Sequence, residues 1–168
     1  AALAGVADRH DAILVVDDTA ANRRLYGTLL EKAGVAWRTA ADGLVALEAL
    51  EAESFSLMLL DFLMPEMDAP EVLEKLRGHP KTAHLPVVVL TGSAEPDHID
   101  QALEAGANDY ITKPVNAKIL VARVMAMIQA ERTRERVYTK QKEALLEELE
   151  EAAQVQQAQL PTVPVRFA

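Results

Sequence analysis

Short apolar runs alternate along this chain with longer segments in which apolar residues recur every three or four positions. The clearest runs lie at residues 12–16 (AILVV), 57–60 (LMLL) and 87–90 (VVVL), and shorter candidates lie at 36–40 and 109–111. Runs that are apolar throughout, instead of at alternate positions, are typical of parallel strands covered by helices on both faces. The pattern therefore predicts five strands of a parallel sheet.

Four helical patterns separate these runs, at residues 20–33, 44–52, 70–76 and 96–105. Glycine follows three of them, at Gly34, Gly78 and Gly106, where we expect it to end the helix. Alternating strands and helices of this kind predict an α/β fold with a doubly wound parallel sheet and right-handed crossovers. Ligands of such sheets bind at the carboxyl ends of the strands, so the residues there are the candidates for function.

A further helical pattern runs from residue 116 to residue 160 without glycine or proline. At about 1.5 Å per residue, a helix of this span would reach roughly 65 Å, so we expect it to extend beyond the globular part. Apolar or aromatic residues recur along it at a spacing of three or four, at Val124, Ile128, Tyr138, Leu145, Leu149 and Ala152. This spacing predicts a parallel coiled coil and hence a homodimer. The coiled coil should be weak, because polar residues interrupt the series at Glu131, Glu135 and Lys142. A single solvated helix is the alternative, although so long a helix without a partner is only marginally stable in water.

Composition and charge narrow the classes of function. The 168 residues carry a formal net charge of −9 and no cysteine, which disfavours direct binding of nucleic acid and excludes disulfides and thiolate metal sites. The apolar runs are far shorter than a membrane span, and the opening AALAGVADRH has no secretory signal pattern. We therefore expect a globular protein of the cytoplasm without a membrane anchor.

Three carboxylates follow two of the predicted strands. Asp17 and Asp18 come directly after the first strand, and Asp61 comes directly after the third. If those two strands are neighbours, the three acids converge at one edge of the sheet. An all-oxygen cluster without histidine or cysteine suits a hard cation, so we predict a Mg²⁺ site.

A hydroxyl and an ammonium follow two further strands. Thr91 ends the fourth predicted strand, and Lys113 comes just after the fifth. Together with the cation they would form a pocket for a tetrahedral phosphoryl group, and Asp61 would be the nucleophile that forms an acyl phosphate. Taken singly, each residue has a plainer interpretation: the aspartate pair as a helix cap, Thr91 as a turn residue and Lys113 as a surface charge. Their joint occurrence at the ends of different strands favours the pocket.

The motifs around these residues carry a family resemblance. LVVDD, LLDFLMPEMDAPE, VVVLTGS and AGANDYITKP occur in the order and spacing of the receiver domain of two-component response regulators, which the chain resembles over residues 11–127. The resemblance implies a flavodoxin-like sheet of strand order 2-1-3-4-5. It also implies a histidine kinase or a phosphotransfer protein as the phosphoryl donor.

The resemblance further assigns individual roles. It implies that Asp61 is the phosphoacceptor and that the main-chain carbonyl of Leu63 completes the Mg²⁺ site with the three acids. It implies that Thr91 and Lys113 bind the phosphoryl group, that Lys113 and Pro114 are joined by a cis peptide, and that Tyr110 is the switch aromatic residue.

The chain departs from the family pattern at a few positions. Ala69 stands where the family commonly has glycine, which predicts a tighter or shifted turn, and Gly92 stands where alanine is commoner. Leu63 and Ser93 occupy positions that influence phosphoryl lifetime in the family. Because an apolar Leu63 side chain cannot orient an attacking water, we expect slow self-dephosphorylation. The four histidines show no metal-ligand spacing, and we assign His10, His79, His84 and His98 to surface loops.

The tail LEELEEAAQVQQAQLPTVP resembles the segment that precedes the catalytic domain of bacterial stress-signalling and sporulation-type (PPM-type) serine/threonine phosphatases. Ala152, Gln156, Leu160 and Pro161 carry this likeness. We therefore expect a disordered segment at 1–10, a receiver at 11–128, a coiled-coil linker at 129–160, and at 161–168 the start of an output domain that is absent here. The receiver would catalyse only its own phosphorylation and dephosphorylation.

Other interpretations stay open at this point. A dehalogenase-type aspartyl-phosphate hydrolase would need a second aspartate two residues after the nucleophile, where this chain has Leu63. A flavin-binding doubly wound domain would need a phosphate loop rich in serine, threonine and glycine after the first strand. A receiver with a different output, such as a cyclase or a protein-docking adaptor, is harder to distinguish.

Overall fold

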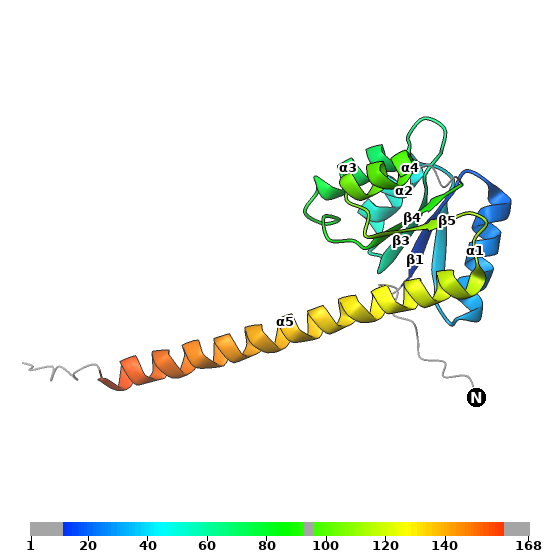
Figure 1. The fold of residues 1–168 in the computed structure, drawn as a ribbon. Helices are drawn as coiled ribbons and strands as arrows, with labels where there is room; N and C mark the ends of the chain where they lie inside the picture. The colour runs from blue at the N-terminus through cyan, green and yellow to red at the C-terminus, as the bar shows by residue number, and fades with distance from the viewer. Residues whose placement is uncertain (1–11, 93–95, 160–168) are drawn as a thin grey trace, which may run out of the picture. The chain divides into compact units, whose positions relative to one another are not determined.

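A computed structural model describes residues 12–92 and 96–159, and five strands alternate with five helices along this part of the chain (Figure 1). The strands are β1 Ile13–Val16, β2 Trp37–Ala40, β3 Leu57–Asp61, β4 Val87–Thr91 and β5 Asp109–Thr112. The helices are α1 Ala20–Lys32, α2 Gly43–Ala52, α3 Ala69–Arg77, α4 Pro96–Glu104 and α5 Ala117–Gln159. All five predicted strands are present, each with bounds within one residue of the prediction.

The strands form one parallel sheet of order β2-β1-β3-β4-β5, which confirms the predicted fold class and strand order. In the register of the sheet, Val16 of β1 lies beside Leu60 of β3, and Asp61 lies beside Leu90 of β4. The carboxyl ends of the three central strands therefore reach the same edge.

Two hydrophobic clusters cover the two faces of the sheet. One contains the buried side chains of α2, α3 and α4, and the other contains those of α1 and of the first part of α5. Neighbouring residues of the three central strands alternate between the clusters. In β1, for example, Leu14 and Val16 belong to the first, and Ile13 and Val15 to the second. This explains why β1, β3 and β4 are buried along their whole length and apolar up to Asp61 and Thr91, which end β3 and β4.

All three predicted glycines lie at the end of a helix. Gly34 and Gly106 follow α1 and α4 with φ of 79° and 109°, a region that favours glycine. Gly78 is the C-cap of α3 with φ of −79°, so it ends this helix as predicted but without a left-handed conformation. The last turn of α3 closes instead through right-handed backbone, in which the Gly78 N–H donates to the Glu74 carbonyl at 3.1 Å.

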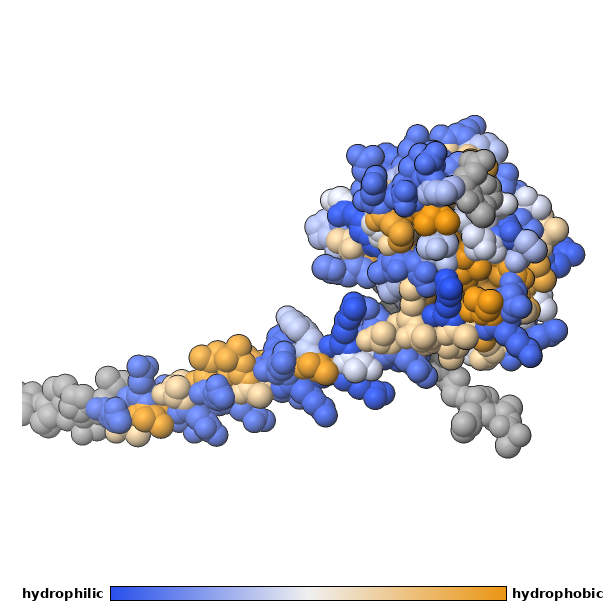
Figure 2. Space-filling view, viewed as in Figure 1, coloured by the Kyte–Doolittle hydropathy of each residue, from blue (hydrophilic) through white to orange (hydrophobic). Residues whose placement is uncertain are grey.

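Helix α5 is continuous from Ala117 to Gln159, and the described chain divides into two units between Ile128 and Gln129. In the first unit, α5 buries Leu120, Val124 and Ile128. In the second, large apolar side chains are exposed and recur among charged ones (Figure 2), namely Val137, Tyr138, Leu145, Leu146, Leu149 and Val155. None of the helices in the described residues is long and apolar enough to span a membrane. The expected disordered segment at 1–10 and the output start at 161–168 lie outside the described residues.

Candidate functional site

Three carboxylates meet at the carboxyl edge of the sheet. Asp17 and Asp18 follow β1, Asp61 ends β3, and one carboxylate oxygen from each lies within 4.8 Å of the others. Asp17 and Asp61 are buried, with 1% and 6% of their surface exposed, whereas Asp18 is exposed. The predicted convergence is thus present, and it leaves one side of the cluster open to solvent.

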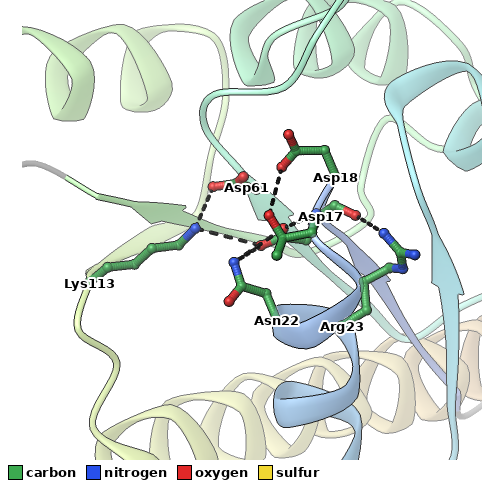
Figure 3. Close-up of polar contacts among 7 residues, drawn as sticks. Asp17, Asp18, Asn22, Arg23, Asp61 and Lys113 are labelled. Atoms are coloured by element: carbon green, nitrogen blue, oxygen red, sulfur yellow. Dashed lines mark hydrogen bonds and ion pairs between the residues drawn. The ribbon is translucent and has the colours of Figure 1, made fainter.

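Helix α1 holds Asp17 in place (Figure 3). The carboxylate of Asp17 accepts hydrogen bonds from the Thr19 main-chain N–H at 2.8 Å and from the Asn22 amide at 3.2 and 3.3 Å. The Arg23 guanidinium donates to the Asp17 main-chain carbonyl at 2.7 Å. Sequence reasoning did not single out Asn22 or Arg23, although their place in the first turn of the helix after the aspartate pair was the available signal.

Lys113 joins the cluster from the segment after β5 (Figure 3). Its Nζ lies 2.8 Å from Asp61 Oδ1 and 3.5 Å from Asp17 Oδ2. Its main-chain N–H donates to the Thr91 carbonyl at 2.7 Å, and the peptide between Lys113 and Pro114 is cis. The Lys113 ammonium is therefore placed to pair with negative charge on Asp61.

Burial and mutual charge shift the pKa values of this pair. Burial raises the pKa of the Asp61 carboxyl above its ordinary value; the hydrogen bond from Lys113 opposes that rise, and the charge of Asp17 adds to it. For Lys113, burial lowers the pKa of the ammonium, but the hydrogen bond to Asp61 and the charges of Asp61 and Asp17 outweigh it and raise the pKa. Lys113 is therefore a stable cation at neutral pH.

The donor set fits a hard divalent cation. Three carboxylates and one ammonium leave an excess of two negative charges when all are ionised, and the clustered ligand atoms are all oxygens. Mg²⁺ prefers such ligands and retains several waters, which the exposed side at Asp18 can accommodate. The acidic site is thus compatible with Mg²⁺.

The other predicted site residues lie around this cluster. Thr91 ends β4 and is 1% exposed. Leu63 follows Asp61 by two residues, and 63% of its surface is exposed. Tyr110 is half-buried in β5, on the strand next to Thr91, and it pairs in register with Val89. Its main-chain carbonyl accepts a hydrogen bond from Arg123 at 2.6 Å.

One expectation about this region, the placement of His98, needs correction. His98 is not in a surface loop but in α4, half-buried, with its ring stacked on Phe62. Ala69, for which a tighter or shifted turn was predicted, is buried as the first residue of α3, and its N–H donates to the Phe62 carbonyl at 3.0 Å. The positive φ in this loop falls at Glu66 instead. His79 and His84 are exposed, and His10 and Ser93 lie outside the described residues.

The raised pKa of Asp61 predicts a pH-dependent effect of Asp61→Asn on stability. Asp61 has one pKa in the folded chain and a lower one in the unfolded chain. At a pH below both values the carboxyl is protonated in either state, and the contribution of Asp61 to the free energy of unfolding is fully present. That contribution is lost as pH rises through the raised folded-state pKa. With a chelator present, we therefore expect Asp61→Asn to raise the free energy of unfolding at pH 7 by roughly 1 kcal/mol. Urea titrations at several pH values should show this gain shrinking toward acid, and a gain that grew toward acid would contradict the assignment.

The fold and the site together define a doubly wound domain with an acidic, lysine-paired pocket at the carboxyl edge of its sheet. The family model of the response regulator receiver domain matches residues 13–125. The chain belongs to this family, whose members are the phosphoacceptor signalling domains of two-component systems.

Similar proteins agree with that membership. The chain is 37% identical over 123 residues to a probable cyclic di-GMP phosphodiesterase of Vibrio cholerae, covering 73% of this chain and 28% of that protein. It is 42% identical over 116 residues to response regulator PleD of Caulobacter vibrioides, covering 68% of this chain and 25% of PleD. The chain thus spans only about a quarter of the length of these two relatives.

Solved structures show the same fold. A CheY-like receiver domain protein from Methanospirillum hungatei has a TM-score of 0.69 and 31% identity, covering 74% of this chain and 98% of that one. The receiver domain of a sensor histidine kinase from Pseudomonas aeruginosa has a TM-score of 0.67 and 26% identity, covering 71% of this chain and 98% of that one. The latter was solved with a magnesium ion coordinated in its active site cleft.

Proposed function

We propose that Asp61 accepts a phosphoryl group from a histidine kinase, a phosphotransfer protein or a small phosphodonor. The observation that carries this proposal is the 2.8 Å contact between Asp61 and Lys113 inside the acidic cluster. A carboxylate oxygen of Asp61 forms the new bond to phosphorus, while the bond from phosphorus to the donor breaks and the donor leaves with the electron pair. The product is an acyl phosphate on Asp61.

The chain's own residues supply the setting for that transfer. Asp17, Asp18, Asp61 and the Leu63 main-chain carbonyl would hold Mg²⁺, and the P. aeruginosa receiver solved with magnesium supports this assignment. The bound cation would neutralise charge on the phosphoryl oxygens. Lys113 would keep its positive charge beside those oxygens, and Thr91 would donate a hydrogen bond to one of them.

The proposal is tested by intact mass after incubation with acetyl phosphate. With Mg²⁺ the wild-type chain should gain the mass of one phosphoryl group, and with a chelator it should not. Peptide analysis should then locate the modification at Asp61. Uptake that is independent of Mg²⁺, or that maps to another carboxyl, would overturn the assignment.

The side chain at position 63 should control the lifetime of the phosphoryl group. Leu63 is exposed and apolar, so it offers no polar atom to orient a hydrolytic water. We expect Leu63→Asn to shorten the half-life of phosphorylated Asp61, on the order of tenfold, because the amide can position that water. Decay of the phosphorylated mass after removal of the donor measures the half-life. Leu44→Asn, at another exposed leucine, is the control, and equal half-lives in all three proteins would rule out this role.

The signal would then pass to the surface formed by α4, β5 and α5, with Thr91 and Tyr110 as switch residues. Their place on the neighbouring strands β4 and β5 supports this role. From there α5 would carry the change to an output domain.

The second unit of α5 would pair with the same segment of another copy as a parallel coiled coil. Its exposed leucines support this pairing, since an exposed leucine adds no burial energy to a single solvated helix. We expect Leu145→Asn to weaken dimerisation by roughly tenfold to a hundredfold, because each dimer loses two buried leucine side chains. Sedimentation velocity over a concentration series measures this. Glu150→Gln, at an exposed site outside the apolar series, is the control. A monomeric wild-type chain at all concentrations would contradict the pairing.

We propose a PPM-type serine/threonine phosphatase as the output, supported by the likeness of Ala152, Gln156, Leu160 and Pro161 to the segment before such domains. Leu160 and Pro161 lie outside the described residues. An output acting on a cyclic dinucleotide is the second candidate, favoured by the V. cholerae relative. In a longer protein that contains this chain, assays with a phosphoserine protein and with cyclic di-GMP distinguish the two.

A further inference from the structure

Helix α4 is attached to the receiver by few buried side chains. Of its nine residues Ala102 alone is buried, whereas α3, which is equally long, buries four. Helices that bury little apolar surface cost the least free energy to displace. Among the three helices on this face of the sheet, α4 is therefore the one that a small change at the site can move most easily.

An aromatic stack joins the first turn of α4 to the residue that follows Asp61. The ring centroids of Phe62 and His98 are 4.3 Å apart, and the ring planes lie within 19° of each other. Phe62 is 3% exposed and His98 is half-buried. Such stacks stabilise packing beyond the burial of area, so this one contributes to the attachment of a helix that has one buried residue.

The main chain of Phe62 is held between two elements. Its N–H donates to the Leu90 carbonyl of β4 at 2.9 Å, and its carbonyl accepts from the Ala69 N–H of α3 at 3.0 Å. The ring itself is enclosed, and protein interiors have little free volume into which a ring can move. A shift of the backbone at Asp61 and Phe62 therefore displaces the ring only if His98 moves with it.

We propose that the Phe62–His98 stack is the positioning contact through which the state of Asp61 sets the position of α4. This deepens the proposed function and depends on it. His98 is outside the acidic cluster of the described residues, and the contact of its ring with Phe62 places it to act on α4 through Phe62. Bound phosphoryl shifts the backbone around Asp61, Phe62 follows, and the lightly attached first turn of α4 adopts a second arrangement.

Hydrogen exchange of α4 tests this inference. Amides of residues 99–104 are followed in wild type, His98→Ala and His98→Phe, with Mg²⁺ alone and with Mg²⁺ and fluoroberyllate as the phosphoryl mimic. We expect the mimic to change α4 exchange roughly threefold or more in wild type. His98→Phe, which keeps a ring that can stack, should retain that change, and His98→Ala should lose it. His84→Ala, at an exposed histidine elsewhere, is the matched control and should behave as wild type.

Phosphoryl uptake from acetyl phosphate is measured in the same proteins and should stay within about twofold of wild type in His98→Ala. Should His98→Ala not fold, Phe62→Leu replaces it, because leucine keeps an apolar side chain but has no ring. It should lose the same response of α4. If α4 of His98→Ala exchanged faster by the same factor with and without fluoroberyllate, the substitution would have removed packing alone, and the inference would be overturned. Normal uptake in wild type without any response of α4 also overturns it while leaving the proposed function intact. Absence of uptake in wild type would overturn the proposed function itself, and this inference with it.

Discussion

Replacing Asp61 by alanine is expected to abolish the Mg²⁺-dependent uptake of a phosphoryl group, to at least about 100-fold below wild type. Asp61 lies nearer to the Lys113 ammonium than Asp17 does, at 2.8 Å against 3.5 Å, and its carboxylate belongs to the cluster that suits the cation. Asp17 cannot readily replace it, because its carboxylate is buried and already accepts hydrogen bonds from Thr19 and Asn22. Intact mass after a time course with acetyl phosphate and Mg²⁺ measures the effect.

Asp100→Ala is the matched control for this experiment, since Asp100 is an exposed acid of α4 outside the cluster. It should take up phosphoryl as wild type does. Full uptake by Asp61→Ala would mean that another carboxyl is the acceptor, and the role given to Asp61 would have to be abandoned.

Replacing Arg77 by methionine is expected to lower the free energy of unfolding by roughly 2–4 kcal/mol. Arg77 is in the last turn of α3, and its guanidinium donates to the Gly106 carbonyl at 2.8 Å, the Leu85 carbonyl at 2.8 Å and Asn108 Oδ1 at 3.0 Å. Weaker bonds reach the carbonyls of Thr82 and Ala83. Burial lowers the pKa of the guanidinium, and these acceptors offset the cost of removing its charge from water. Methionine fills similar space but donates no hydrogen bond to these acceptors.

Urea denaturation measures this loss, with Arg38→Met as control. The side chain of Arg38 is 52% exposed, so its loss should change stability by no more than about 0.5 kcal/mol. Arg77→Lys should fall between wild type and Arg77→Met, because a lysine ammonium cannot reproduce the planar fork of donors. If Arg77→Met were as stable as Arg38→Met, the network around Arg77 would contribute little to the fold.

Local patterns in the chain already determined the fold class and the central site. Apolar runs such as residues 57–60 need cover on both faces, which requires a parallel sheet with helices on either side. In such a sheet the carboxyl ends of the strands share one edge, so Asp17, Asp18, Asp61 and Lys113 could be placed together from their positions after the strands alone. The structure brings these four residues together. Strand periodicity and strand ends are local properties, and local properties can be read from a sequence.

Only the tertiary structure decided which distant side chains hold one another. Arg77 meets Gly106 and Asn108 across a gap of about thirty residues, and Phe62 meets His98 across a similar one. No periodicity marks such pairs, because they depend on the angle at which each helix packs and on the rotamer that the local packing allows. For the same reason His98 was predicted to lie in a loop, whereas it lies in α4. Helix ends and ring stacks are settled by packing, which becomes visible only when all the elements are in place.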